Sequence, residues 1–196
     1  MSGPFRVLFV CTGNICRSAA AEHLLRAALH QPASGDATIV VTSAGTHAVV
    51  GYPTDPPTAS ALRRRQVDPA GHLARTLTAV EVAAADLVLG ATRAHRAAAV
   101  SLYPRAVHYS YTVAEFARLA GSVVSRPGTG PESLEALLTE VRATRGIVRA
   151  ADPLDDDIAD PYGRSDDAHG AAVAAIATAT EVIAGALSRA TAHPGP

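Results

Sequence analysis

Eight consecutive residues near the N-terminus combine thiols, a glycine and a guanidinium group: Cys11-Thr12-Gly13-Asn14-Ile15-Cys16-Arg17-Ser18. Gly13 and Asn14 are residue types that tolerate a left-handed backbone, so this segment can curl tightly. When a curled loop leads into a helix, its backbone N–H groups point inward and bind an anion at the positive end of the helix dipole. Arg17 would add a planar fork that binds two phosphoryl oxygens. The segment therefore predicts a phosphate-binding loop.

A thiol at the centre of such a loop would face the bound phosphorus. The surrounding N–H donors and Arg17 should favour the thiolate of Cys11 over the thiol, and the thiolate is the nucleophilic form. The Cys-x5-Arg spacing alone is a weak signal, because the chain has 17 arginines in 196 residues and no lysine. The prediction depends instead on Gly13, Asn14 and Ser18, and on the elements that flank the loop. Without that setting, a cysteine at the end of a buried strand is usually an inert apolar residue.

The residues on either side of the loop have the patterns of a strand and a helix. Phe5–Val10 is short and rich in β-branched and aromatic residues, which predicts a buried strand. Four apolar residues that follow the loop in sequence recur at the spacing of one helical face, which predicts a helix: Ala21, Leu24, Leu25 and Ala28.

Strand and helix patterns continue to alternate through the first half of the chain. They predict strands at about 38–43, 86–89 and 106–109, and helices at about 58–65 and 93–102. Strands that alternate with helices at this spacing form parallel sheets. We therefore expect a single-domain, three-layer α/β fold over 1–196, with a four-stranded, twisted parallel sheet flanked by helices. The phosphate-binding loop would lie between the first strand and the first helix.

The pattern changes after Tyr111. Thr112–Glu115 has the form of a capping box and should begin a short helix that ends at Ala120. The remaining predictions are a break at 125–130, an amphipathic helix over about 134–146, an acidic loop at 152–160, a last helix with apolar positions Val173, Ile176, Ile183 and Leu187, and a flexible tail at about 190–196.

Composition and charge exclude several classes of protein. The formal net charge is -1, whereas binding to nucleic acid or to a membrane surface would need a basic field. Two cysteines cannot build a disulfide framework, and no His/Cys spacing resembles a zinc site, which favours a reducing compartment. No apolar run approaches the roughly 20 residues of a membrane span. The N-terminal apolar run is also too short for a signal peptide, so we expect a cytoplasmic protein.

These motifs together resemble a known family, the low-molecular-weight protein tyrosine phosphatases. The signature loop of that family reads almost as residues 11–18 do here. The resemblance extends through Ser43–Thr46, Gly71–Arg75, Asp86–Leu89 and Asp160–Tyr162. It covers the chain except for about 113–152, which is longer than the family usually has and is expected to be a helical insertion.

The resemblance implies a mechanism with a phosphocysteine intermediate. Cys11 would attack phosphorus while the loop N–H groups and Arg17 stabilise the equatorial oxygens of the transition state. Asp160 would protonate the leaving oxygen and then deprotonate the water that hydrolyses the intermediate. The hydroxyl of Ser18 would donate to the Cys11 sulfur and help the thiolate leave. No metal or cofactor would be needed, because the loop and the arginine already supply positive charge.

The resemblance also implies supporting and substrate-binding residues. Asn14, Ser43 and His72 would form a hydrogen-bond network that fixes the strained loop, and Tyr162 would stack against an aryl leaving group. The family members that have Ile at position 15 generally act on phosphotyrosine, whereas Thr there goes with phosphoarginine. The implied substrate-binding set is Thr12, Gly13, Asn14, Ile15, Cys16, Ser18 and Tyr162.

The expected walls of the pocket depart from the family. Gly163 stands where the family often has a second aromatic residue after Tyr162. The stretch 43–51 offers His47, Val49 and Val50 in place of tryptophan. We expect a bacterial type of pocket with weaker peptide selectivity.

Cys16 allows two interpretations. It could pack under the loop, or it could form a reversible disulfide with Cys11 that shields the nucleophile from over-oxidation. Analogy with the family favours the disulfide.

The chain has four Asp-Pro pairs, which most often begin turns or helices: Asp55-Pro56, Asp68-Pro69, Asp152-Pro153 and Asp160-Pro161. Only Asp160 is followed by an aromatic residue and then by the final helix, which favours it over Asp152 as the acid. The carboxylates at 155–157 are expected to form a solvated acidic loop. No partner can be assigned from sequence to His23, His30, His95 or His108.

Two other functions remain open. An arsenate reductase would use the same cradle; the type that relays a disulfide through downstream cysteines is excluded, because no cysteine follows Cys16, but a version that uses a small-molecule thiol is not. A non-catalytic module that binds phosphate would need neither nucleophile nor acid. The preferred prediction is a phosphatase whose partners are a phosphotyrosine protein or aryl phosphate, with phosphate or another oxyanion in the loop.

Overall fold

A four-stranded parallel sheet with the strand order β2-β1-β3-β4 forms the middle of the molecule. The computed structural model describes residues 3–29, 39–124, 131 and 133–191. Its strands are β1 (Phe5–Cys11), β2 (Ile39–Gly45), β3 (Leu87–Gly90) and β4 (Ser110–Thr112). Every pairing is parallel, so the expected α/β sheet is confirmed. The predicted break at 125–130 and residues 192–196 of the predicted tail lie outside the described residues. Residues 190–191 of that tail are helical and Ala190 is buried, so the tail was predicted to begin too early.

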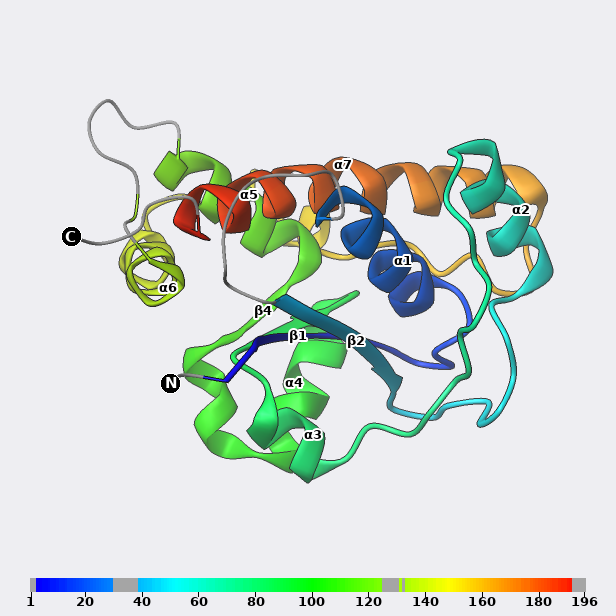
Figure 1. Cartoon of the computed structure of the whole chain (residues 1–196), viewed down its shortest axis with the longest axis horizontal. Coiled ribbons are helices and arrows are strands. Elements are labelled where there is room, and N and C mark those ends of the chain that lie inside the picture. Colours follow the sequence, from blue (N-terminus) through cyan, green and yellow to red (C-terminus); the bar gives the residue numbers. More distant parts are fainter. Residues whose placement is uncertain (1–2, 30–38, 125–130, 132, 192–196) are drawn as a thin grey trace.

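Successive residues of β1 face opposite layers, as the two-residue period of a strand requires. Val7 and Phe9 pack with residues of α1 (Arg17–Leu29), α5 (Val113–Val124) and α7 (Asp166–Thr191). Leu8 and Val10 pack on the other side, with residues of α3 (Ala79–Ala84) and α4 (Arg93–Leu102). Figure 1 shows these two groups of helices on opposite faces of the sheet. The remaining elements are α2 (Pro56–Arg64), α6 (Leu134–Thr144) and the 3-10 helices η1 (Pro104–His108) and η2 (Pro153–Asp156).

The strand order reverses at β1, which has β2 on one side and β3 on the other. In open parallel sheets, ligands bind beyond the carboxyl ends of the strands at such a reversal. Cys11 is the last residue of β1, and Arg17 is the first residue of α1. The predicted phosphate-binding loop therefore occupies the expected ligand position of this fold.

The fourth strand was predicted at the wrong residues. Segment 106–109 lies in and just after η1, where the N–H of Tyr109 donates to the carbonyl of Ala106 at 3.0 Å. The strand is Ser110–Thr112, which pairs with Val88–Gly90. Ser and Thr at both ends of this short buried strand removed the apolar run that a sequence pattern needs. Helix α3 was also missed, although Thr78 and Glu81 form its capping box.

The predicted helices of the second half are confirmed, with one change of length. Thr112 and Glu115 form the expected reciprocal cap of α5, with bonds of 3.0 and 3.2 Å, but the helix continues to Val124. Phe116 and Leu119 of α5 and Leu137 of α6 are buried in the same core as α7 and one face of the sheet. The segment 113–152 thus enlarges one apolar layer.

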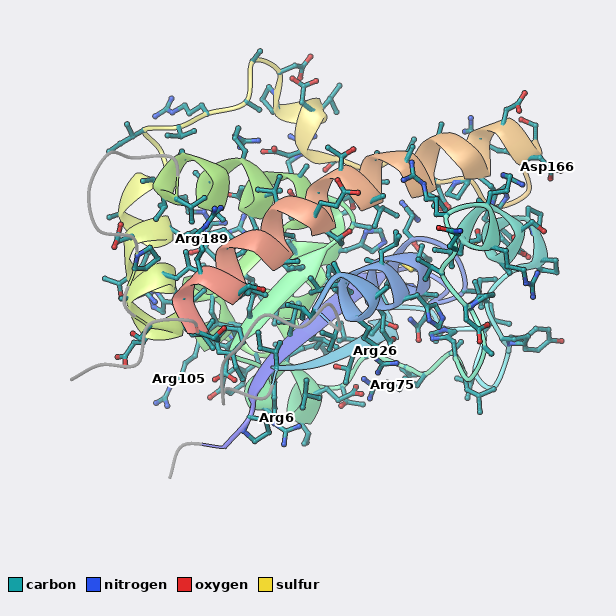
Figure 2. The ribbon with its side chains drawn as sticks, turned by 45° about the horizontal axis from the view of Figure 1, so that its top comes forward. Arg6, Arg26, Arg75, Arg105, Asp166 and Arg189 are labelled. Carbon is teal, nitrogen blue, oxygen red and sulfur yellow. The ribbon has the colours of Figure 1, made fainter. Side chains whose placement is uncertain are left out.

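Helix α7 is the longest helix of the described residues, and in Figure 2 it runs from Asp166 to the region of Arg189 across one face of the molecule. By length and composition alone it could cross a membrane, so the expectation that no segment approaches such a span was wrong. More than half of its most apolar stretch is buried inside the structure. It packs against α1, α2, α5 and α6, as the central helix of a globular core does.

A first prediction concerns the contact between the end of β2 and the loop. A Cβ atom at Gly45 would lie 2.5 Å from the carbonyl oxygen of Thr12 and 3.1 Å from Cα of Ala48. Because both neighbours are backbone atoms, Gly45→Ala should lower the free energy of unfolding by about 2 kcal/mol or more. The measurement is urea unfolding followed by circular dichroism.

Gly121→Ala is the matched control. Its Cβ would meet only Cγ1 of Val182 at 3.4 Å, an ordinary contact, in the interior of α5. We expect this change to be neutral or to stabilise by up to about 1 kcal/mol. Equal stability of Gly45→Ala and wild type would contradict the predicted clash.

Candidate active site

The loop between β1 and α1 turns its carbonyl groups outward. The carbonyl oxygens of Cys11, Thr12 and Gly13 accept hydrogen bonds from N–H groups of segment 46–49 at 2.9 to 3.0 Å. Within the described part of the chain, no protein acceptor is bound to the N–H groups of residues 13–16. A loop with its carbonyls engaged and its N–H groups unpaired has the polarity of an anion cradle.

Asn14 fixes the curl of this loop. Its φ of 56° lies in the left-handed region that Asn tolerates better than most side chains. Its Nδ2 donates to Oγ of Ser18 at 2.9 Å and to Oγ of Ser43 at 2.8 Å. Its Oδ1 accepts the N–H of Arg75 at 2.9 Å, and its carbonyl accepts from Nε2 of His72 at 2.6 Å. The structure therefore brings together the residues expected to support the loop.

Glu22, which was not predicted, sets the direction of this network. An ionised carboxylate can only accept, so the hydroxyl of Ser43 donates to Glu22 and accepts from Asn14. The other amide hydrogen of Asn14 goes to Ser18, which leaves the hydroxyl hydrogen of Ser18 for the sulfur of Cys11 at 2.9 Å. The network thus directs a hydroxyl donor at the sulfur of Cys11.

The charge of Glu22 is maintained by its neighbours. Burial raises the pKa of this carboxyl. The nearby His72, whose Nδ1 lies 3.7 Å from Oε2, the hydrogen bond from Ser43 and the charge of Arg26 outweigh burial and hold the pKa below its usual value. Glu22 lies one turn after Ser18 on α1 and is buried. The only hint of this role in the sequence was that an acidic residue lies beside the apolar face of α1.

Arg17 joins the loop to the segment that carries Asp160. Its side chain is 5% exposed, and its Nη2 lies 2.7 Å from Oδ2 of Asp160. Its Nη1 donates to the carbonyl of Ile158 at 3.2 Å. Its Nε is buried and has no protein acceptor among the described residues, so it remains available to an oxyanion. Asp152, the rival of Asp160, instead caps η2 through the N–H of Leu154.

A pocket of about 190 Å³ opens above the loop. This volume suits a phosphoryl group with one ring better than a drug-sized ligand, for which pockets of roughly 300 Å³ or more are usual. Val50, one of the expected walls, is 65% exposed and does not line the pocket. The lining residues are Cys11, Thr12, Gly13, Ile15, Cys16, Arg17, His47, Val49, Asp160 and Tyr162.

Comparison with known sequences places this loop and sheet in one family. A family model described as low molecular weight phosphotyrosine protein phosphatase matches residues 6–125. The chain belongs to this family. The match ends before α6 and before Asp160, so the segment that carries the expected acid lies beyond it.

Individual relatives match up to about half of the chain. The low molecular weight protein-tyrosine-phosphatase Etp of Escherichia coli (strain K12) is 38% identical over 98 residues, which are 50% of this chain and 62% of Etp. The probable low molecular weight protein-tyrosine-phosphatase EpsP of Ralstonia solanacearum is 42% identical over 83 residues, which are 42% of this chain and 52% of EpsP. The chain thus spans about half to three fifths of the length of these relatives.

Solved structures support the fold over nearly the whole chain. Vibrio vulnificus Wzb in complex with benzylphosphonate has a TM-score of 0.67 at 24% identity, covering 93% of this chain and 99% of Wzb. The YwlE arginine phosphatase from Geobacillus stearothermophilus has a TM-score of 0.66 at 26% identity, covering 93% of this chain and 92% of YwlE.

In this member of the phosphatase family, the acidic loop before Asp160 is not simply solvated, as was expected. Asp156 forms an ion pair with Arg118 of α5, and Asp157 forms one with Arg93 of α4. Asp155 accepts the N–H of Asp152 at 3.1 Å and completes the cap of η2. The arginine partners lie far away in sequence, so charge patterning could not identify them.

Cys16 is a buried, free thiol in this structure, as is Cys11. Burial raises the pKa of Cys16 to about 12, against a hydrogen bond with Thr58 that lowers it. Ligand atoms of Cys16, Asp55 and His169 lie within 4.8 Å of one another, and these are metal-binding residue types. However, the hydroxyl of Thr58 lies 2.8 Å from Nδ1 of His169, the nitrogen that a metal would need. The cluster is therefore a hydrogen-bonded unit rather than an open metal site, and the disulfide of Cys16 stays a prediction.

His95 contacts the phosphate-binding loop, and the sequence patterns did not predict this contact. Its Nε2 lies 2.9 Å from Oγ1 of Thr12, and its Nδ1 lies 2.7 Å from Oγ1 of Thr92, the N-cap of α4. Burial, together with the charge of Arg17, lowers the pKa of His95 to about 4. The ring is thus neutral near neutral pH and links the loop to α4. The Thr-x-x-His spacing at the helix start was the only local signal.

A second prediction follows from this pKa. The unfolded chain binds a proton at His95 near pH 6.5, whereas the folded chain resists it down to about pH 4. The unfolded state therefore binds more protons in this window, and stability falls as the pH is lowered through it. Between about pH 7 and about pH 4.5, wild type should lose about 1 to 2 kcal/mol more than His95→Gln, allowing for partial solvent screening.

Urea unfolding at the two pH values measures this difference. Glutamine keeps one donor and one acceptor for Thr12 and Thr92 but does not titrate. His108→Gln is the matched control, because His108 is exposed at the end of η1; its acid sensitivity should equal that of wild type. Equal losses for wild type and His95→Gln would contradict the prediction.

Proposed function

We propose that the chain is a protein tyrosine phosphatase that hydrolyses phosphomonoesters through a phosphocysteine intermediate. The observation that supports this most is the convergence of Cys11, Arg17 and Asp160 on one small pocket. The pocket lies over the loop whose N–H groups at 13–16 bind no acceptor among the described residues. Binding alone would need neither a nucleophile nor an acid.

The first step transfers the phosphoryl group to the enzyme. The loop N–H groups and Arg17 hold the equatorial oxygens, so that the sulfur of Cys11 attacks phosphorus in line with the leaving oxygen. The S–P bond forms as the P–O bond to the leaving group breaks, and the carboxyl of Asp160 gives its proton to the leaving oxygen. The incoming dianion competes with Asp160 for the guanidinium of Arg17, which would release the carboxyl toward the leaving oxygen.

The second step returns the enzyme to its starting state. A water molecule attacks the phosphorus of the phosphocysteine, and the carboxylate of Asp160 takes the proton of that water. The P–S bond breaks and leaves the sulfur of Cys11 as a thiolate. The hydroxyl of Ser18, 2.9 Å from this sulfur, stabilises the departing charge. No step of this cycle calls for a metal or a cofactor.

The lining favours an aryl phosphate as substrate. Ile15 and Val49 supply apolar surface, and Tyr162 is an exposed ring at the rim beside Asp160. An aromatic leaving group would pack on this surface. The proposed substrate partner is a phosphotyrosine protein. The proposed location of the enzyme is the cytoplasm.

A third prediction tests catalysis. Wild type should hydrolyse p-nitrophenyl phosphate, and Cys11→Ser should abolish turnover. Asp160→Asn should lower kcat by about a hundredfold or more, because hydrolysis of the phosphocysteine loses its general base. Asp152→Asn is the matched control, because it alters the neighbouring Asp-Pro pair and should keep nearly full activity. Binding of phosphate without turnover in wild type would favour a non-catalytic module, and faster turnover of arsenate with a small thiol would favour a reductase.

A fourth prediction tests the substrate class. Wild type should hydrolyse a phosphotyrosine peptide at least about tenfold better, in kcat/KM, than the same peptide carrying phosphoarginine. Ile15→Thr should narrow this ratio, because the smaller polar side chain removes apolar wall next to the phosphoryl group. Phosphoarginine is the alternative substrate to test, because one of the similar structures is an arginine phosphatase. Preference of wild type for phosphoarginine would contradict the assignment.

A further inference from the structure

The segment that carries Asp160 takes its position from contacts with other elements. The side chain of Asp160 is 49% exposed, and so it is not held by burial. Two residues earlier, the N–H of Ile158 donates to the carbonyl of Ala91 at 2.9 Å, and its carbonyl accepts from Arg17. The segment is also attached by the ion pair of Asp160 itself with Arg17 and by the ion pairs of the preceding carboxylates, at 156 and 157.

The pair of Arg118 with Asp156 is the more buried of these two attachments. The side chains of Arg118 and Asp156 are 26% and 14% exposed, against 45% and 27% for Arg93 and Asp157. The contact is bidentate: Nη1 donates to Oδ1, and Nη2 donates to Oδ2 at 3.3 Å. A planar, two-point pair fixes orientation as well as distance. Nε of Arg118 is buried and has no acceptor among the described residues, so this guanidinium depends on Asp156.

Helix α5, which carries Arg118, is packed into the core. Phe116, Leu119 and Ala120, which flank Arg118 on the helix, are at most 1% exposed. Figure 1 shows α5 beside α7 over the sheet. Arg118 is therefore held by the core and projects to the acid segment.

We propose that Arg118 is a positioning residue for the general acid, which it places through Asp156. The inference rests on the proposed function, in which Asp160 protonates the leaving oxygen. Three residues separate Asp156 from Asp160, so their Cα atoms are at most about 14 Å apart along an extended chain. Since Ile158 is anchored separately, loss of the pair loosens the placement of Asp160 without removing the carboxyl. This assigns a role in placing the acid loop to the first helix of segment 113–152.

The test uses leaving groups of different quality. Phenolate is a poor leaving group that needs the proton of the acid, whereas p-nitrophenolate leaves with little help. In Arg118→Gln and in Asp156→Asn, kcat/KM for phenyl phosphate should fall about tenfold, and kcat/KM for p-nitrophenyl phosphate by less than about threefold. The parameter kcat/KM reports the step that releases the phenol. Asp156→Asn provides a second route to the result if Arg118→Gln folds poorly.

Arg145→Gln is the matched control. Arg145, at the end of α6, forms an ion pair with Glu115 of α5. The side chains of this pair are 23% and 15% exposed, close to the values for Arg118 and Asp156. The hydrogen bonds of Arg145 go to Glu115, Val107 and Ser110, and none goes to the acid segment. Arg145→Gln should lower thermal stability like Arg118→Gln, but it should affect both esters equally.

A double variant separates positioning from general damage. If Arg118 acts through Asp160, then Arg118→Gln should change kcat/KM for phenyl phosphate by less than about twofold in an Asp160→Asn background. An equal fall for both esters, or full additivity with Asp160→Asn, would overturn the inference. Wild type that hydrolyses neither ester would overturn the proposed function as well, whereas an active wild type matched by Arg118→Gln on both esters would overturn the inference alone.

Discussion

The site depends on one residue whose polar groups are almost all engaged at once. Asn14 has a left-handed backbone, and its side chain and carbonyl bind partners from α1, from β2 and from segment 72–75. These bonds hold the curl that turns the loop N–H groups toward a single point. They also link three parts of the chain that are distant in sequence. The carboxylate of Glu22 then gives the network a direction, because it can only accept. Ser43 donates to Glu22, Asn14 donates to Ser43 and Ser18, and the hydroxyl hydrogen of Ser18 is left for Cys11.

The proposed nucleophile and the proposed acid are held by different kinds of interaction. Cys11 is 2% exposed and lies within a buried polar network at the end of a central strand. Asp160 is half exposed and lies on a segment fixed by arginine ion pairs and a few backbone bonds. Buried networks resist salt, whereas partly exposed ion pairs are screened. Placement of the acid is therefore the more sensitive of the two to ionic strength.

The sequence was sufficient where the signal is local, and insufficient where partners are distant. The loop of residues 11–18 and the strand and helix beside it could be predicted, because the residue types and their order carry the information. The strand at Ser110–Thr112 could not, since its polar ends hide a buried strand. Glu22 and His95 contact the site through folding of the whole sheet, and the pair of Arg118 with Asp156 spans 38 positions. Periodicity and charge counts do not contain such pairings.

The two halves of the site meet at the guanidinium of Arg17. Its Nη2 contacts Asp160, its Nη1 holds the carbonyl of Ile158, and its buried Nε has no acceptor among the described residues. An oxyanion in the loop would bind Nε and compete for Nη2. The bond from Nη1 to Ile158 need not break when this happens. The segment then stays docked while the carboxyl of Asp160 is released toward the leaving oxygen, so that binding of the anion itself frees the acid at the place where it is needed.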